Sequence, residues 1–284
     1  MAVLTFSAVA AGQRAVVIEP VANMFSKPSG EVDVVSQAIL GAAVGVVEIE
    51  GGWARIQTPD EYRGWVRLGE LRPLGEGESY AERGRVASAA SLVTHVYPVP
   101  SVTRRAPVLT VPFETRLEVV EERPEENGRW IGVRLPDGRQ GWVQRGDVAF
   151  DPPAMDVAGL VELSKRFLGL PYTWGGTSSF GFDCSGFTQM LCRRGGVTIP
   201  RDAQPQADWE GMAKVDKKDL RAGDLLYFGP SKEKITHTGF YLGNGEFIHS
   251  TTSQTPVLQI SRLEEENWTK QFVCARRWSR QVKQ

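Results

Sequence analysis

The feature that most constrains this chain is a diverged repeat in its first half, built around paired tryptophans. Each copy places two tryptophans twelve residues apart, Trp53 and Trp65 in the first and Trp130 and Trp142 in the second. A Pro-Asp turn lies between the members of each pair, at residues 59–60 and 136–137. The flanking segments alternate polar with β-branched or aromatic residues, as β-hairpins do. Many short strands with little helical periodicity predict two small β-barrels, in which the plain interpretation of the tryptophans is core.

The repeat resembles bacterial SH3-like domains over about residues 15–74 and 86–150. A polar, glycine-rich joint at Gly75–Ser79 separates the two barrels. Phe150–Pro153 forms a second joint, because consecutive prolines end a strand and stiffen the linker. We therefore expect three domains: a first barrel over residues 1–75, a second and structural barrel over 76–150, and a functional domain over 151–284.

The bulk composition excludes several classes of partner. The chain has 284 residues, 41% hydrophobic content and a formal net charge of −1, with Lys and Arg scattered rather than gathered in a stripe. That balance gives no electrostatic reason to bind nucleic acid or an anionic membrane surface. No apolar run approaches the length that spans a bilayer, so no membrane partner is expected. We expect a monomer.

The cysteines and the N-terminus bear on the compartment. Three cysteines (Cys184, Cys192 and Cys274) are too few and too widely spaced for a disulfide framework, and an odd number leaves a free thiol. Free thiols suit a reducing compartment. Residues 1–12 are apolar but lack the basic region of a signal peptide. We expect a cytoplasmic location, or a secreted one if a signal peptide has been removed.

Cys184 is predicted to stand at the start of a helix. The apolar residues after it recur at helical spacing, and basic residues followed by glycine at 193–196 predict the C-terminus. Unpaired N–H groups and the helix dipole favour a thiolate there, so we expect a lowered pKa and a nucleophilic sulfur. The alternative is a buried structural cysteine, which the polar and open surroundings of Asp183, Ser185 and Gly186 disfavour.

A nucleophilic cysteine needs a base, and the chain has only three histidines. His95 falls in the second barrel, where a surface or structural role is the plain interpretation. His237 and His249 belong to two alternating segments joined by Gly243–Gly245, a hairpin signal. A three-residue loop puts both imidazoles on one face, about 7–8 Å apart, whereas a two-residue turn puts them on opposite faces. We predict the three-residue loop; the alternative is two unrelated histidines on exposed strands.

Six short motifs in the last third of the chain together resemble the NlpC-type papain-like cysteine peptidases. They occur in the family's order over about residues 155–279, and are Pro171–Gly176, Phe182–Gly186, Pro200–Asp202, Gly223–Leu225, His237–Gly239 and Phe247–Ser250. The resemblance implies an α+β papain-like domain with Cys184 as nucleophile, His237 as general base and His249 as the residue that orients it. It also implies that the hydroxyl of Tyr172 contributes to the oxyanion hole. A histidine in the third position steadies the base less strongly than a carboxylate does.

Barrels joined to such a domain resemble one subgroup, the γ-D-glutamyl-L-diamino-acid endopeptidases, or dipeptidyl-peptidase VI-like enzymes. This resemblance implies release of L-Ala-γ-D-Glu from murein stem peptides with a free N-terminal L-Ala. The residue after γ-D-Glu is meso-diaminopimelate or Lys. The first barrel is expected to close one end of the cleft, with Tyr62 and Asp33 gripping the amine. A carboxylate there would offset the desolvation of the ammonium.

The same resemblance implies substrate contacts within the catalytic domain. They come from Asp183, Ser185, Trp174 and Asp202. Ala203 stands where some relatives carry a serine that touches substrate. Contact at that position is therefore lost, or passes to the backbone or to Asp202.

Three other functions are compatible with the sequence. A Cys–His pair serves any acyl transfer, so an amidase or acyltransferase on the same scaffold is the second enzymatic interpretation. A cell-wall binding protein with a degenerate catalytic domain is the non-enzymatic one, and intact Cys184, His237 and His249 argue against it. A zinc site built from those three residues matches no compact metal motif. We expect no metal and no cofactor.

Overall fold

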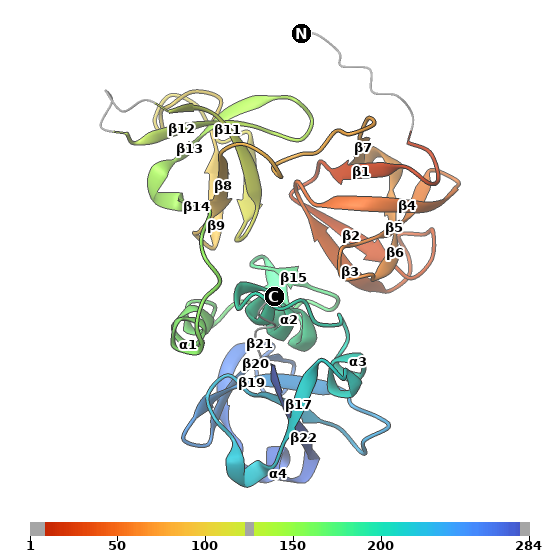
Figure 1. Ribbon diagram of the computed structural model, residues 1–284, viewed down its shortest axis with the longest axis vertical. Helices are drawn as coiled ribbons and strands as arrows, with labels where there is room; N and C mark the ends of the chain where they lie inside the picture. Colours follow the sequence, from red (N-terminus) through yellow and green to blue (C-terminus); the bar gives the residue numbers. More distant parts are fainter. Residues whose placement is uncertain (1–8, 123–127, 279–284) are drawn as a thin grey trace. The chain divides into compact units, whose positions relative to one another are not determined.

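The computed structural model describes residues 9–122 and 128–278 and is rich in strands (Figure 1). The chain divides into two compact units, residues 1–152 and 153–284, described here in turn. Residues 1–8, part of the stretch behind the signal-peptide expectation, lie outside the described residues. Among the helices in the described part of the chain, none is long and apolar enough to cross a membrane.

The first tryptophan pair belongs to a seven-stranded antiparallel sheet. Its strands are β1 (Arg14–Val17), β2 (Val21–Phe25), β3 (Val34–Ile39), β4 (Ala43–Glu50), β5 (Trp53–Gln57), β6 (Arg63–Arg67) and β7 (Leu71–Pro73), in the spatial order β3-β2-β6-β5-β4-β1-β7. Alternate side chains of these strands fill one apolar core. Trp65 is buried, whereas Trp53 lies at the margin, edge-on to Phe25 and beneath the guanidinium of Arg67. The plain interpretation as core thus holds for Trp65 and only partly for Trp53.

The second copy repeats this arrangement. Its strands are β8 (Val86–Ala89), β9 (Val93–Val96), β10 (Leu109–Pro112), β11 (Arg116–Glu122), β12 (Trp130–Arg134), β13 (Gln140–Gln144) and β14 (Val148–Phe150), forming a sheet of order β13-β12-β11-β8-β14 and a β10-β9 ribbon. The tryptophan hairpins match in register, since Trp53 faces Arg67 and Trp130 faces Gln144. Each hairpin leads through one 3₁₀ turn, at 68–70 or 145–147, into a short strand. The predicted pair of SH3-like barrels is confirmed.

The second unit is an α+β domain, as predicted. It comprises α1 (Val157–Lys165), β15 (Thr177–Ser178), β16 (Gly181–Phe182), α2 (Cys184–Arg194), α3 (Ala203–Asp208), β17 (Met212–Val215), β18 (Leu225–Phe228), β19 (His237–Gly243), β20 (Glu246–Thr251), β21 (Val257–Arg262), α4 (Glu266–Gln271) and β22 (Phe272–Trp278). The sheet has the order β17-β22-β18-β19-β20-β21, and α2 packs against β19 and β20. The helix that begins with Cys184 therefore lies on the strands that carry His237 and His249.

The β19–β20 hairpin differs from the prediction at its tip and agrees with it in its body. Gly243 pairs with Glu246, so the loop is a two-residue turn of Asn244 and Gly245, both at positive φ (53° and 80°). The predicted three-residue loop is wrong. A β-bulge between Tyr241 and Gly243 then shifts the register by one residue, and Phe240 faces Ile248 as expected. The bulge cancels the effect of the shorter turn, so the two histidines still share a face.

Candidate active site

Cys184 is the first residue of α2, where the local sequence starts the helix. Asp183 is the N-cap: its backbone is extended, and its Oδ1 accepts a hydrogen bond of 2.7 Å from the N–H of Gly186. Arg193 and Arg194 occupy the last turn, where cations complement the helix dipole. Gly186 also permits a close approach, because a Cβ there would stand 2.2 Å from the carbonyl oxygen of Gly176. The predicted helix start is confirmed.

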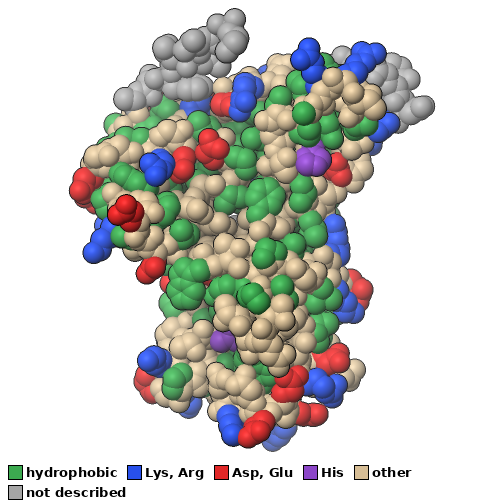
Figure 2. Space-filling view, turned by 180° about the vertical axis from the view of Figure 1, so that it is seen from behind, with side chains coloured by type: hydrophobic (Ala, Val, Ile, Leu, Met, Phe, Trp, Pro, Cys, Tyr) green, Lys and Arg blue, Asp and Glu red, His purple; other side chains and the backbone are tan. Residues whose placement is uncertain are grey.

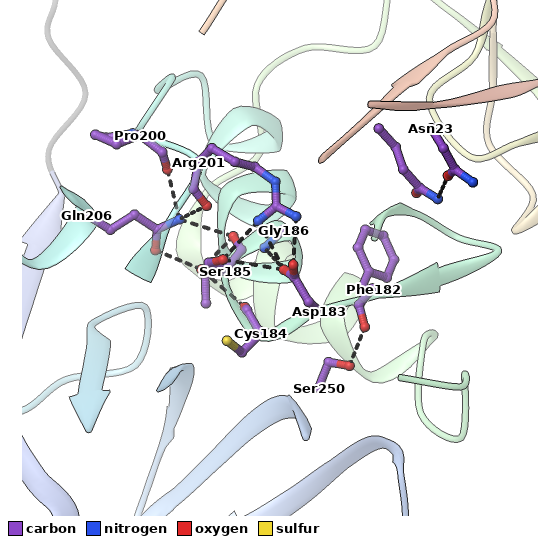
Figure 3. A network of polar contacts seen from close by, with 12 residues as sticks. Asn23, Phe182, Asp183, Cys184, Ser185, Gly186, Pro200, Arg201, Gln206 and Ser250 are labelled. Carbon is purple, nitrogen blue, oxygen red and sulfur yellow. Dashed lines mark hydrogen bonds and ion pairs between the residues drawn. The ribbon is translucent and has the colours of Figure 1, made fainter. Parts of the chain in front are cut away.

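A buried ion pair supports this helix start (Figure 3). Arg201 binds both carboxylate oxygens of Asp183: Nη1 donates to Oδ1 at 3.1 Å, and Nη2 donates to Oδ2 at 2.7 Å. Nη1 also donates to the hydroxyl of Ser185 at 2.9 Å, and that hydroxyl donates to Oδ1 at 3.3 Å. Arg201 is only 2% exposed, so the pair is shielded from water and salt. Asp183 and Ser185 therefore hold the helix terminus together, a role that the sequence did not reveal.

Gln206 ties α3 to the same helix. Its side-chain NH₂ donates to the carbonyl oxygens of Ser185 at 3.1 Å and Pro200 at 2.9 Å. Its Oε1 accepts from the hydroxyl of Thr188 at 3.0 Å. Gln206 is fully buried, and a buried amide keeps its position only when its donors and acceptor are satisfied. Figure 3 shows it beside Pro200 and Arg201, so α2 and the 200–206 segment form one polar assembly.

The thiol of Cys184 does not have the lowered pKa expected from its helix position. Burial, and next the charge of Asp183, raise the pKa of the thiol from 9.0 to about 12. The backbone N–H groups of Thr238 and Ser185 donate toward the sulfur and lower its pKa, as Arg201 does, but by less. The expectation of a resting thiolate is therefore wrong, because the sulfur is buried and lies beside a carboxylate. Thr238 directly follows His237 in the sequence, so this contact brings the sulfur close to His237.

His237 and His249 meet directly, which confirms that they share a face. Nε2 of His237 lies 2.7 Å from Nδ1 of His249, and Nε2 of His249 lies 3.1 Å from Oγ of Ser261. His249 and Ser261 come from neighbouring strands, β20 and β21. Because Nε2 of His237 is engaged, its Nδ1 is the ring nitrogen left to take a proton from a thiol.

Aromatic rings surround both imidazoles. Trp268 stacks on His237 with ring centres 5.3 Å apart and meets His249 edge-on at 4.8 Å. Phe228 lies 5.8 Å from His237, and Phe247 lies 4.6 Å from His249. Burial lowers the pKa of His237 from 6.5 to about 4, and burial together with His237 lowers the pKa of His249. Both imidazoles are neutral at pH 7, the state in which a histidine can accept a proton.

The phenol of Tyr172 is near enough to Cys184 for the charge of the thiolate to affect its pKa. Burial, and next the charges of Cys184 and Asp183, raise the pKa of its phenol, so the hydroxyl stays protonated and can donate. Its backbone is fixed by a bridge to Phe182 and by a hydrogen bond from its N–H to the carbonyl of Pro256. Ser250 holds the same segment, since its hydroxyl donates to the carbonyl of Phe182 at 2.6 Å. A protonated phenol on a backbone held in this way can serve as a hydrogen-bond donor.

The remaining predicted residues fall in two groups. Trp174, two residues beyond Tyr172, is 67% exposed, which is unusual for so large an apolar ring, and Asp202 is the N-cap of α3. Tyr62 and Asp33 belong to the other unit: Tyr62 packs on the first-barrel core, and Asp33 is exposed just before β3.

Two further expectations concern His95 and a metal site. His95 pairs with Thr110 within the second barrel, at 2.9 Å. Across residues 9–122 and 128–278, no three His, Cys, Asp or Glu side chains gather closely enough to hold a metal ion.

Five residues of this site escaped prediction, and they did so for one reason. They are Arg201, Gln206, Ser250, Ser261 and Trp268, each buried or nearly so and each acting through contacts far apart in the sequence. Arg201 and Ser250 stand inside motifs that the family resemblance had marked, which was the available signal. Gln206, Ser261 and Trp268 carry no local signal.

Comparisons with known proteins identify the families that this chain resembles. Residues 169–277 match the NlpC/P60 family, and residues 24–71 match the bacterial dipeptidyl-peptidase Sh3 domain. Over 262 residues the chain is 34% identical to a gamma-D-glutamyl-L-lysine dipeptidyl-peptidase of Bacillus cereus, covering 86% of this chain and 74% of that protein. It is 24% identical to dipeptidyl-peptidase 6 of Lysinibacillus sphaericus, covering 89% and 93%.

A solved structure extends the match to the fold. The crystal structure of an NlpC/P60 family protein from Bacillus cereus superposes with a TM-score of 0.81 at 28% identity, covering 93% of this chain and 99% of that one. With a buried cysteine at a helix start and a histidine pair beside it, the chain belongs to the NlpC/P60 family of cysteine peptidases, in its form preceded by bacterial SH3-like domains.

Proposed function

We propose that this protein hydrolyses the bond between γ-D-Glu and the diamino acid of murein stem peptides that have a free N-terminal L-Ala, releasing L-Ala-γ-D-Glu. One observation carries the proposal: the similarity to the Bacillus cereus dipeptidyl-peptidase extends over 262 residues and so includes both the barrels and the catalytic domain. The matched Sh3 domain is described by the same activity class. A relative that shared only the NlpC/P60 domain would support a cysteine peptidase without this preference.

The proposed chemistry is acyl transfer through Cys184. Nδ1 of His237 takes the thiol proton as the sulfur attacks the γ-carbonyl of D-Glu, and His249 orients and steadies the imidazolium that forms. The hydroxyl of Tyr172 and backbone N–H groups at the start of α2 donate to the oxyanion. The amine of the diamino acid leaves with the proton from His237. Water then cleaves the thioester, returning the thiol and releasing the dipeptide.

Substrate recognition is assigned to both units. Within the catalytic domain we assign it to Asp183, Ser185, Trp174 and Asp202. Trp174 is supported by its exposure, because an aromatic ring that is 67% open to solvent is free to pack against a ligand. Tyr62 and Asp33 of the first barrel are assigned to the α-ammonium of L-Ala. The carboxylate of Asp33 is exposed and can pair with a cation.

The organisation and setting follow the same proposal. We assign residues 1–75 to a substrate-gripping barrel, 76–150 to a structural barrel and 151–284 to catalysis. Cys184, Cys192 and Cys274 are all free, which supports a reducing, cytoplasmic setting and a role in recycling wall peptides. We propose a monomer. We also propose that it binds neither nucleic acid nor membrane, which is supported by a net charge of −1 and by the interspersed basic and acidic side chains on the face shown in Figure 2.

The decisive experiment compares four peptides. The purified protein is incubated with L-Ala-γ-D-Glu-meso-diaminopimelate, with the L-Lys analogue and with an N-acetylated copy of each, and products are separated by chromatography. We expect L-Ala-γ-D-Glu from the free amines, little product from the acetylated forms, and none with Cys184→Ala. Equal cleavage of free and acetylated peptides would refute the dependence on a free L-Ala. Transfer to an added amine faster than hydrolysis would identify an acyltransferase instead.

A further inference from the structure

The histidine pair continues into a third polar residue that no sequence motif contains. Ser261 stands in β21 opposite Phe247, and its hydroxyl lies 3.1 Å from Nε2 of His249. Ser261 is 9% exposed and His249 is fully buried, so water does not readily replace this contact. Hydrogen bonds therefore run without a break from β19 through β20 to β21.

The direction of these hydrogen bonds matters because each ring can carry its proton in two places. A neutral imidazole has one N–H donor and one lone-pair acceptor. The 2.7 Å contact between His237 and His249 needs one donor and one acceptor, so the tautomer of either ring dictates that of the other. Burial in the aromatic cage of Trp268, Phe228 and Phe247 keeps both rings neutral, as their lowered pKa values indicate.

Only one direction allows His237 to act as a base. If Ser261 accepts from Nε2–H of His249, then Nδ1 of His249 accepts from Nε2–H of His237, and Nδ1 of His237 presents a lone pair. If Ser261 donates instead, every proton moves to the other nitrogen, and His237 presents an N–H that cannot take the proton of Cys184. The two arrangements differ in no heavy-atom position.

We propose that Ser261 is a positioning residue that sets the tautomer of His249, and through it the basic form of His237, by accepting the hydrogen bond from Nε2 of His249. The proposal rests on the proposed function for its catalytic consequence, but the tautomer itself is independent of any substrate. Removing the hydroxyl leaves a buried N–H without its acceptor, and buried polar groups strongly favour arrangements in which they are paired. Without Ser261 the productive direction leaves the buried Nε2–H of His249 unpaired, whereas the reverse direction leaves only an acceptor nitrogen unpaired. The productive tautomers are therefore less favoured in its absence.

The test reads the tautomers and the rates separately. Long-range ¹H–¹⁵N correlation spectra of the full chain at neutral pH distinguish protonated from unprotonated ring nitrogens. The chain has three histidines, and His95, bonded to Thr110 in another domain, serves as an internal control. In the unsubstituted protein we expect His237 and His249 both protonated at Nε2. Protonation of His249 at Nδ1 would overturn the proposal without any mutation, so a variant that fails to fold cannot hide the answer.

Three variants complete the test. For Ser261→Ala we expect mixed tautomers and a kcat lowered roughly tenfold, equivalent to about 1.4 kcal/mol, with little change in KM. Ser261→Thr keeps a hydroxyl and should restore both the spectrum and kcat. Ser253→Ala, a serine outside the histidine contacts, should behave as the unsubstituted protein.

Two results with Ser261→Ala would overturn the proposal. One is unchanged tautomers with unchanged kcat. The other is a lower kcat with unchanged tautomers and no rescue by threonine, which would mean that Ser261 is merely structural. If the unsubstituted protein cleaves none of the peptides, the proposed function fails, while the spectra still decide the tautomer assignment.

Discussion

Arg201 binds both carboxylate oxygens of Asp183, the residue immediately before Cys184, through a buried two-point ion pair. The same guanidinium bonds Ser185, immediately after the cysteine. The residues on either side of the sulfur are therefore fixed by one side chain from a separate segment. Such a pair is costly to break from one side, because the remaining charge is left buried without a partner.

Truncation of Arg201 should therefore destabilise the catalytic unit. Arg201→Ala is expected to lower the free energy of unfolding by about 3–5 kcal/mol, measured by urea denaturation. Arg201→Lys should also destabilise, since lysine cannot reproduce the two parallel bonds. Arg262→Ala is the matched control, because Arg262 makes only exposed ion pairs and its loss should cost less than about 1 kcal/mol. Equal effects of the two alanine variants would contradict this account.

The raised pKa of Cys184 predicts how the free protein reacts with iodoacetamide. The thiolate is the reactive form, and with a pKa of about 12 its fraction keeps rising through neutral and mildly alkaline pH. Alkylation of Cys184, followed by mass spectrometry, should therefore accelerate steadily between pH 6 and 9 without a plateau. A plateau that begins near pH 5 would instead reveal a resting thiolate–imidazolium pair. Cys274, which is partly exposed, serves as the internal comparison in the same digest.

The neutral histidine pair predicts a loss of stability in acid. The pKa of His237 is about 4 in the folded protein, against 6.5 when solvated, so between these values the unfolded chain binds more protons. The contribution to the free energy of unfolding is fully present above pH 6.5 and is lost as the pH falls toward 4. His249, whose pKa is also lowered, adds in the same direction.

Thermal unfolding at several pH values between 7 and 4 checks this prediction. The variant His237→Gln/His249→Gln lacks both titrating groups, so its Tm should fall less steeply with pH than that of the unsubstituted protein. Parallel curves would show that carboxylates elsewhere account for the acid sensitivity.

The hydroxyl of Tyr172 is expected to matter for the rate rather than for binding. Tyr172→Phe removes one donor from the developing oxyanion, a change that typically lowers kcat about 10²-fold or more, and KM should change little. Tyr80→Phe provides the control. Tyr80 lies outside the catalytic unit, and its hydroxyl donates to the carbonyl of Arg134. A Tyr172→Phe enzyme with full kcat would remove Tyr172 from the oxyanion hole.

The comparison of sequence with structure shows where local patterns are sufficient. The tryptophan repeat and the start of α2 follow from periodicity and helix capping, which act within a few residues. The shared face of the histidines agrees with the prediction, but it depends on a bulge rather than on the predicted loop. The prediction of the hairpin tip is wrong because a bulge between Tyr241 and Gly243 accompanies a shorter turn, and a bulge has no reliable sequence signal.

The pKa of Cys184 could not be predicted from the sequence, for a different reason. Helix position alone suggested a low pKa for Cys184, but burial and Asp183 outweigh it, and burial is a tertiary property. Likewise Ser261 and Trp268 meet the histidines only because β21 and α4 fold back onto them.

The last prediction concerns the first barrel and its proposed binding of the substrate amine. If Asp33 pairs with the α-ammonium of L-Ala, Asp33→Asn should lower kcat/KM for L-Ala-γ-D-Glu-L-Lys roughly 10- to 100-fold, the range of a charge-assisted hydrogen bond. Tyr62→Phe should lower it as well. The matched control is Glu61→Gln, because Glu61 is an exposed acid in the turn beside Tyr62.

Activity on the acetylated peptide separates recognition from general damage. An Asp33→Asn enzyme that grips the amine less well should discriminate less between the free and the acetylated peptide. If its preference for the free amine is unchanged, the ammonium is bound elsewhere, and the acid that offsets its desolvation is another carboxylate.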